Sequence, residues 1–156
     1  MRPIVPGGRR PPRAGGATAS RRPGSTAYPL TLDDCGFEVT FDAAPERVVT
    51  IKSSTTEMLL ALGLGDRIVA RAFADGPVPD SLADAAADVP AVVEPLSDQV
   101  PGAEAVLETE PDLVYAGWES NLTADGAGDR ATLAQLGVAP SGAPAACSAR
   151  EARPGR

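Results

Sequence analysis

A cluster of small hydroxyl side chains follows one apolar run of the chain. The stretch "VVTIKSSTTE" places Lys52, Ser53, Ser54, Thr55, Thr56 and Glu57 directly after the run. Ser54 and Glu57 have the S-x-x-E spacing of a capping box, which predicts a helix that begins at Thr55. Backbone N–H groups at a helix N-terminus, beside hydroxyls and a lysine, can hold an anionic or polar ligand group. The alternative is that Ser54 only caps the helix.

Two other short loops carry polar or aromatic residues after apolar runs. One contains Asp75 and Gly76, and Asp75 by itself is typical of a turn. The other holds Trp118, the only tryptophan, followed by Glu119, Ser120 and Asn121. Trp118 could be a flat platform for a ring-containing ligand, or it could pack against a neighbouring part of the protein. An aromatic ring, a carboxylate and an amide together favour a site.

The residues that are missing exclude several chemistries. The chain has no histidine, which excludes histidine-based triads, histidine general bases and the usual zinc ligand sets. It also lacks the glycine-rich motifs of nucleotide and dinucleotide sites and the G-x-S-x-G motif of hydrolases. Nucleotide-binding, dinucleotide-binding and hydrolase functions therefore lose their usual support, and we expect no cofactor and no metal site. The two cysteines, Cys35 and Cys147, are either unrelated thiols or one bridge.

The elements that would position these loops alternate along the chain. Residues 28–41 read as a β-hairpin, and buried strands are predicted at 48–51, 67–72 and 113–116, with a fourth beginning at Val138. Helices are expected between them: one ends at Gly63 and presents Met58, Leu59 and Leu62 on one face, and the last presents Leu133 and Leu136. This order predicts an α/β fold with a parallel sheet of about four strands, flanked by helices and preceded by the hairpin. The carboxyl ends of such strands meet at one edge, where ligands bind.

The two ends of the chain differ in composition from the middle. Residues 1–27 hold six arginines and no acid, which predicts a disordered basic tail, and the sequence from Pro140 onward has the composition of a tail, with 148–156 disordered. Residues 28–149 hold 20 acids and five bases, a charge of −15. That charge argues against binding of nucleic acid or an anionic membrane, and no stretch is long enough to span a bilayer. A small acidic interaction domain whose basic tail binds an acidic partner is the alternative function.

The middle of the chain resembles a known family. "PERVVTIKSSTTEMLLALGLGDRIVA", then "EAVLETEPDLVYAG" and "TLAQLGV", are similar to the amino-terminal lobe of the substrate-binding proteins of ABC importers, in the branch that captures iron–siderophores and cobalamin. The stretches "IKSSTTE", "DGPVP", "YAGWESN" and "PAAC" are similar to an actinobacterial subgroup associated with a deazaflavin-cofactor precursor. The resemblance covers residues 28–147.

This resemblance implies an extracytoplasmic, non-catalytic binding protein that delivers a small molecule to an ABC permease. Two α/β lobes, joined by a long helix, would clamp the ligand, and residues 28–147 would be the first lobe. The family's ligand loops map onto Lys52 to Glu57, Asp75-Gly76 and Trp118 to Asn121. In that setting Cys35 and Cys147 could form a disulfide, as an oxidising compartment permits.

Two features depart from the family. The family needs a spanning helix and a second lobe, and this chain ends before either; it also needs an export signal, and residues 1–27 contain no hydrophobic segment of that kind. We therefore expect a single lobe encoded by a truncated or misassigned reading frame.

Overall fold

A β-hairpin opens the part of the chain that is described. The computed structural model describes residues 25–144 and Cys147. Strands β1 (Leu30–Asp34) and β2 (Phe37–Phe41) pair antiparallel, as their alternating residues predict. The two-residue turn uses Cys35 and Gly36, both at positive φ (56° and 84°), which is the backbone that a twisted hairpin of this loop length needs.

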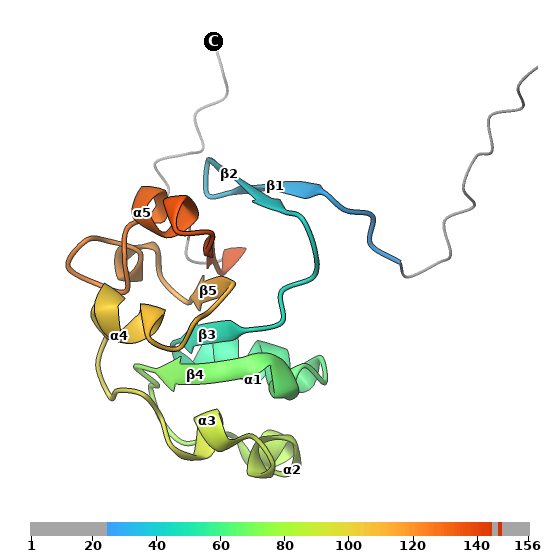
Figure 1. The fold of residues 1–156 in the computed structure, drawn as a ribbon. Helices are drawn as coiled ribbons and strands as arrows, with labels where there is room; N and C mark the ends of the chain where they lie inside the picture. Colours follow the sequence, from blue (N-terminus) through green and yellow to red (C-terminus); the bar gives the residue numbers. More distant parts are fainter. Residues whose placement is uncertain (1–24, 145–146, 148–156) are drawn as a thin grey trace, which may run out of the picture.

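The predicted parallel sheet is present and has four strands. They are β3 (Val48–Ile51), β4 (Ile68–Ala72), β5 (Leu113–Ala116) and β6 (Ala139–Gly142), in the spatial order β4-β3-β5-β6 (Figure 1). All three neighbouring pairs run parallel. Every residue of β3 is buried, as expected for a central strand that is covered on both faces.

Helices cover both faces of this sheet. The longest is α1 (Ser53–Ala61), and α2 (Ala83–Ala87) and α3 (Pro90–Val93) lie on the same side of the sheet. On the other side are α4 (Ala103–Leu107) and α5 (Arg130–Gln135), whose Val106 and Leu133 pack against Val49 and Val114. Three short 3-10 turns complete the connections: Gly65–Arg67, Asp80–Leu82 and Glu119–Asn121.

The start of α1 differs from the prediction. The helix begins at Ser53 with Lys52 as its N-cap, and no side chain caps it, so the capping box and the start at Thr55 were wrong. The hydroxyl of Thr55 instead donates to the carbonyls of Ile51 (2.9 Å) and Lys52 (3.0 Å). Because Lys52 has a φ of 83°, the chain turns one residue after β3, and Ser54 already lies in the first helical turn.

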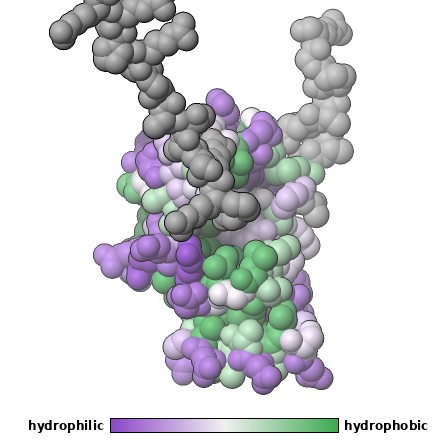
Figure 2. Space-filling model, turned by 90° about the vertical axis from the view of Figure 1, so that its right-hand side faces the viewer, coloured by the Kyte–Doolittle hydropathy of each residue, from purple (hydrophilic) through white to green (hydrophobic). Residues whose placement is uncertain are grey.

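The predicted buried faces of two helices were also wrong in part. Helix α1 buries Leu59 and Leu60 and leaves Met58 and Leu62 half-exposed or more (50% and 63%), and Leu136 after α5 is exposed too. Met58 and Leu62 line an open hollow of about 720 Å³ beside the hairpin. Figure 2 shows hydrophobic residues gathered in a patch in the lower half of one face of the molecule.

Helix α1 ends as its sequence predicts. Gly63 has a φ of 71°, and its N–H donates to the carbonyl of Leu60 (3.0 Å). The N–H of Leu64 donates to the carbonyl of Leu59 (2.8 Å), which completes a Schellman motif. Glycine adopts this left-handed backbone conformation at little cost in free energy, because it has no Cβ.

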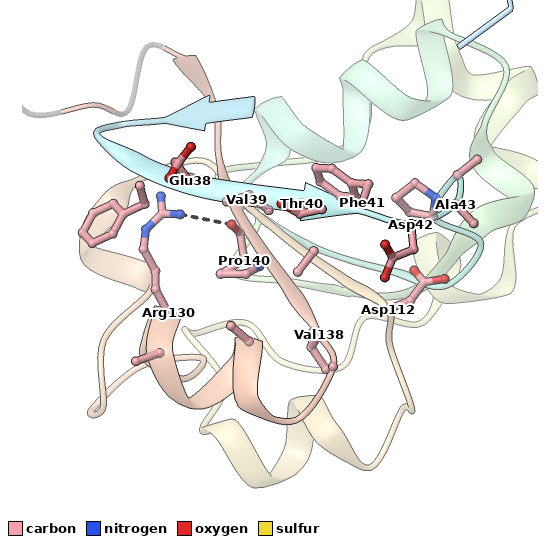
Figure 3. Close-up of a pocket in the computed structure, with 17 residues that line it drawn as sticks. Glu38, Val39, Thr40, Phe41, Asp42, Ala43, Asp112, Arg130, Val138 and Pro140 are labelled. Atoms are coloured by element: carbon pink, nitrogen blue, oxygen red, sulfur yellow. Dashed lines mark hydrogen bonds between the residues drawn. The ribbon is translucent and has the colours of Figure 1, made fainter. Parts of the chain in front are cut away.

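Strand β6 occupies residues that the composition assigned to a tail. Pro140 to Gly142 continue the sheet, so the tail from Pro140 onward was wrong. The outer edge of β6 is blocked: Pro140 has no N–H, its carbonyl accepts from Arg130 Nη1 (3.0 Å, Figure 3), and the N–H of Gly142 donates to Asp34 (3.1 Å). These contacts explain how so proline-rich a segment can form an edge strand.

The two tails proposed at the ends of the chain lie largely outside the described residues. Residues 1–24 and 148–156 are among those that the structure does not describe, and residues 25–27 form no helix or strand. Within residues 25–144, no helix has the length and apolar character needed to cross a membrane.

Candidate ligand-binding site at the strand ends

Three loops meet where the order of the strands reverses. From β3 the chain adds β4 on one side of the sheet and later β5 on the other, so the carboxyl ends of β3 and β5 form the topological switch point. The N–H of Lys52 donates to the carbonyl of Ala72 (3.1 Å), and the N–H of Gly117 donates to that of Ile51 (2.9 Å). The residues that follow β3, β4 and β5 are therefore neighbours, as the sequence predicts.

Lys52 is the centre of this arrangement. Its side chain is only 5% exposed, and its ammonium donates to Asp75 Oδ1. The ammonium also lies over two rings, 4.2 Å from the centroid of Phe73 and 3.9 Å from that of Trp118. Opposite charge and two aromatic faces offset the desolvation of the buried cation. The lysine therefore ties three loops together and presents no free charge to a ligand.

Gly117 lets the β5 loop come close to Lys52. A Cβ at position 117 would lie 2.7 Å from Lys52 Cβ and 3.1 Å from Ser54 Oγ. Such contacts are closer than van der Waals packing allows, so the approach of the two loops requires glycine.

Side-chain hydrogen bonds of Ser53 and Arg71 hold the loop after β4 in place. Ser53 Oγ accepts from the N–H of Asp75 (2.8 Å), and Arg71 Nη2 donates to the carbonyl of Gly76 (3.1 Å). Arg71 is 9% exposed and also donates from Nη1 to the carbonyl of Val92 (2.9 Å), while its Nε has no hydrogen-bond partner within the described part of the chain. We did not single out Arg71 from the sequence.

The turn after β5 is held by its own side chains. Asn121 is buried, and its Oδ1 accepts from the N–H of Trp118 (3.2 Å). Glu119 accepts two hydrogen bonds from Arg130, at 2.8 Å and 2.7 Å. Trp118 itself stays 54% exposed and meets Phe73 edge-on, with ring centroids 6.4 Å apart. The turn therefore keeps the indole at the surface.

Arg130 links this turn to the hairpin. Its Nη2 also donates to Asp34 Oδ1 (2.9 Å), and its guanidinium lies 4.7 Å from the centroid of Phe37. Burial by itself would lower the pKa of Arg130, but the hydrogen bonds and charges of Glu119 and Asp34 raise it above its usual value. Arg130 is thus a permanently charged cross-link, which the sequence analysis missed.

The chain is similar to known proteins over part of its length. No family model matches it. It is 34% identical over 98 residues to the uncharacterized ABC transporter substrate-binding lipoprotein YvrC of Bacillus subtilis (strain 168), covering 62% of this chain and 28% of that protein.

Solved structures are also similar to this chain. A periplasmic binding protein from Veillonella parvula is 28% identical, with a TM-score of 0.65, over 79% of this chain and 40% of that one. An ABC-type Fe³⁺-hydroxamate transport system from Saccharomonospora viridis is 27% identical, with a TM-score of 0.59, over 78% and 41%.

The chain resembles one lobe of the ABC transporter substrate-binding proteins. It spans between 28% and 41% of the length of these three relatives. They are substrate-binding proteins rather than enzymes, as the resemblance implied.

The predicted ligand residues of this lobe differ in how much surface they offer. Ser54, Asp75, Gly76, Trp118 and Ser120 are exposed; Ser53, Glu57 and Glu119 are half-buried; Lys52, Thr55, Thr56 and Asn121 are buried. The buried members make contacts within the protein, for example the bond between Thr56 and Thr50 (2.8 Å). Only the exposed and half-buried members can touch a ligand without rearrangement.

A disulfide joins the hairpin to the segment after β6. Cys35 and Cys147 are 112 residues apart in sequence, with Cα atoms at 5.1 Å. Cys35 directly follows Asp34, so the disulfide and the Arg130 ion pair fasten the same turn of the lobe.

Two hollows among the described residues lie away from the three loops of this site. One of about 580 Å³ lies between β2, α5 and β6 (Figure 3), and the other lies beside α1. Asp112 lines the first hollow, but its carboxylate already accepts hydrogen bonds from the N–H groups of Glu46 (2.7 Å) and Arg47 (3.0 Å). The described residues hold no cluster of acids and cysteines suited to a metal ion.

Proposed function

We propose that this chain supplies one lobe of the ligand-binding cleft of a solute-binding protein that serves an ABC importer. The observation that carries the proposal is the convergence of three loops on Lys52, which leaves Trp118 exposed at the switch point of a parallel sheet. Such a rim is where open α/β sheets bind ligands.

The ligand would lie against the exposed side chains of this rim. Trp118 offers a flat apolar face, and Ser54, Asp75 and Ser120 offer hydrogen-bonding groups around it. We propose a ligand of the siderophore, cobalamin or deazaflavin type; the actinobacterial deazaflavin subgroup stays part of this proposal. The likeness to a Fe³⁺-hydroxamate transport protein supports the siderophore class among these.

The partner and the compartment follow from the same proposal. An ABC permease would receive the ligand, and the lobe would work outside the cytoplasm. The relatives are a periplasmic protein and a lipoprotein, and the pairing of Cys35 with Cys147 suits an oxidising compartment.

A single lobe should bind weakly. A ligand clamped between two lobes buries most of its surface, and one lobe offers roughly half of that contact. We therefore expect dissociation constants weaker than about 1 μM. Sub-micromolar affinity, measured by isothermal titration calorimetry on this chain, would contradict the argument from half a cleft.

The position of binding is the decisive test. In a two-dimensional ¹⁵N NMR titration with gallium(III) siderophore complexes, cobalamin and a deazaflavin, the shifted amides should be those of residues 52–57, 75–76 and 118–121. Gallium(III) replaces iron(III) because it is diamagnetic. Shifts confined to the hollow between β2, α5 and β6, or none with any ligand at millimolar concentration, would refute the proposal.

A further inference from the structure

We propose that the ligand group held against Trp118 is uncharged or cationic, and that this lobe disfavours anionic ligands. The inference rests on the proposed function and narrows the class of its ligand. It comes from the exposure and the partners of the charged side chains of the rim.

The cations of the rim point inward. The side chain of Lys52 is 5% exposed and that of Arg130 is 8% exposed, while Arg71 is 9% exposed. Each is engaged: Lys52 by Asp75, Arg130 by two carboxylates, and Arg71 by two backbone carbonyls. A ligand that arrives at Trp118 therefore meets no accessible positive charge from these three residues.

The carboxylates of the rim are more exposed than its cations, although both oxygens of Glu119 accept hydrogen bonds from Arg130. The side chain of Asp75 is 58% exposed, that of Glu119 is 27% exposed, and Glu57 is half-buried. Residues 28–144 hold 20 acids against five bases, so the more distant charges act in the same direction. Charged groups of one sign lower the local concentration of ions of that sign.

The indole has one face free for stacking. Lys52 covers one face, with its ammonium 3.9 Å from the centroid, yet Trp118 keeps 54% of its surface exposed. Lys52 and Asp75 balance each other's charge, so the buried ammonium adds no net positive charge at the outer face of the ring. A planar, uncharged group or a cationic complex can stack there, whereas an anion meets the exposed oxygen of Asp75.

Trp118 reports the sign of its own surroundings. It is the only tryptophan of the chain, so collisional quenching of its fluorescence measures the local concentration of the quencher. We would compare iodide, caesium and neutral acrylamide, each normalised to its quenching of free N-acetyltryptophanamide. The expected result is weaker quenching by iodide than by caesium, with a difference that shrinks as sodium chloride is added. Equal or stronger quenching by iodide would overturn the inference.

A matched pair of variants separates the rim from the overall charge. Asp75→Asn removes the exposed carboxylate, and Asp66→Asn removes an exposed carboxylate at the opposite, amino end of β4. Because Lys52 contacts both Asp75 and the indole, the carboxylate of Asp75 lies within about 7 Å of the ring. A unit charge at that distance in water changes the concentration of a monovalent ion beside the ring by about two- to threefold. Iodide quenching should rise by about that factor in Asp75→Asn and little in Asp66→Asn. Equal changes in the two variants, with the fold intact by circular dichroism, would also overturn the inference.

Ligands of opposite charge test the inference on binding itself. The probes are the gallium(III) complexes of desferrioxamine B, which is a cationic trihydroxamate, and of a trianionic tris-catecholate. We expect the cationic complex to shift the amides of residues 118–121 at lower concentration, and Asp75→Asn to narrow the difference. Tighter binding of the anionic complex at the same loops would overturn the charge inference and leave the proposed function standing. Failure of both complexes, and also of cobalamin and the deazaflavin, to shift these loops would instead refute the proposed function, and with it this inference.

Discussion

Reduction of the disulfide should remove much of the stability of this domain. The bond between Cys35 and Cys147 closes a loop of 112 residues, which includes every strand and helix from the hairpin turn to β6. On the chain-entropy model, closing a loop of 112 residues stabilises the folded state by about 4.8 kcal/mol. A domain of this size has a total stability of roughly 6–18 kcal/mol.

The assay is urea unfolding with and without a reductant. With an m-value of about 1.5 kcal/mol per molar urea, a loss of 4.8 kcal/mol lowers the midpoint by about 3 M. Circular dichroism and the emission of Trp118 should give the same midpoint if unfolding has two states. The oxidised protein should show no free thiol when it is denatured without reductant.

The double variant Cys35→Ser/Cys147→Ser is the control for side effects of the reductant. Its midpoint should equal that of the reduced wild-type protein and should not change on addition of reductant. Two free thiols in the untreated protein would show that the disulfide does not form. If the disulfide is present but its reduction shifts the urea midpoint by less than about 0.5 M, the entropic reasoning is refuted.

Three further predictions follow from single contacts. Gly117→Ala places a methyl group against Lys52 and should lower the free energy of unfolding by about 1–3 kcal/mol in urea titrations, whereas Gly76→Ala, whose new Cβ meets nothing within 4 Å, should have little effect. Arg130→Met leaves two part-buried carboxylates without their cation and should lower the free energy of unfolding by about 3 kcal/mol in urea titrations at neutral pH; a loss below about 1 kcal/mol would contradict this reasoning. Asp129 caps α5, and hydrogen bonds from Thr132 lower the pKa of its carboxyl group. The stability that these hydrogen bonds give is present above the ordinary pKa of the carboxyl group and is lost as the pH falls through the lowered pKa. An NMR titration of the carboxyl group should show the lowered pKa.

The sheet was predictable because its signals are local. Strands β3, β4 and β5 and the hairpin each carry their own apolar or alternating pattern, and turn residues separate them. The glycine stops at Gly63 and Gly137 are equally local, since each needs only a positive φ. Strand β6 was recognised only in part, because the contacts that make Pro140 acceptable at a sheet edge come from Arg130 and from no neighbour in sequence.

The start of α1 could not be predicted from its own residues. The S-x-x-E spacing of Ser54 and Glu57 is typical of a capping box, but the cap is Lys52, whose φ of 83° follows from its position among three loops. The faces of α1 depend on tertiary structure as well. Met58 faces the hollow beside the hairpin and not the sheet, and no periodicity within the helix distinguishes these two environments.

The anchors of the candidate site were missed for a related reason. Arg130 reaches Asp34 across 96 residues of sequence, and Arg71 reaches the carbonyl of Val92 across 21. Neither arginine belongs to a motif, and the partner of such a lone arginine cannot be read from the sequence. Only the composition could have pointed to these two arginines. The segment holds five bases and 20 acids, so a base inside a strand or beside a helix cap must find acceptors within the fold.

The placement of these cations explains how short loops can form a defined rim. A loop of four or five residues has few apolar contacts to hold it, and hydrogen bonds to water do not fix its position. Here each loop is bound to a buried cation that a neighbouring element holds: the β4 loop to Lys52 and Arg71, and the β5 turn to Lys52 and Arg130. Because Lys52 contacts both loops, a ligand that displaces Trp118 must also disturb the pair with Asp75. The rim should therefore respond to a ligand as one unit, and not loop by loop.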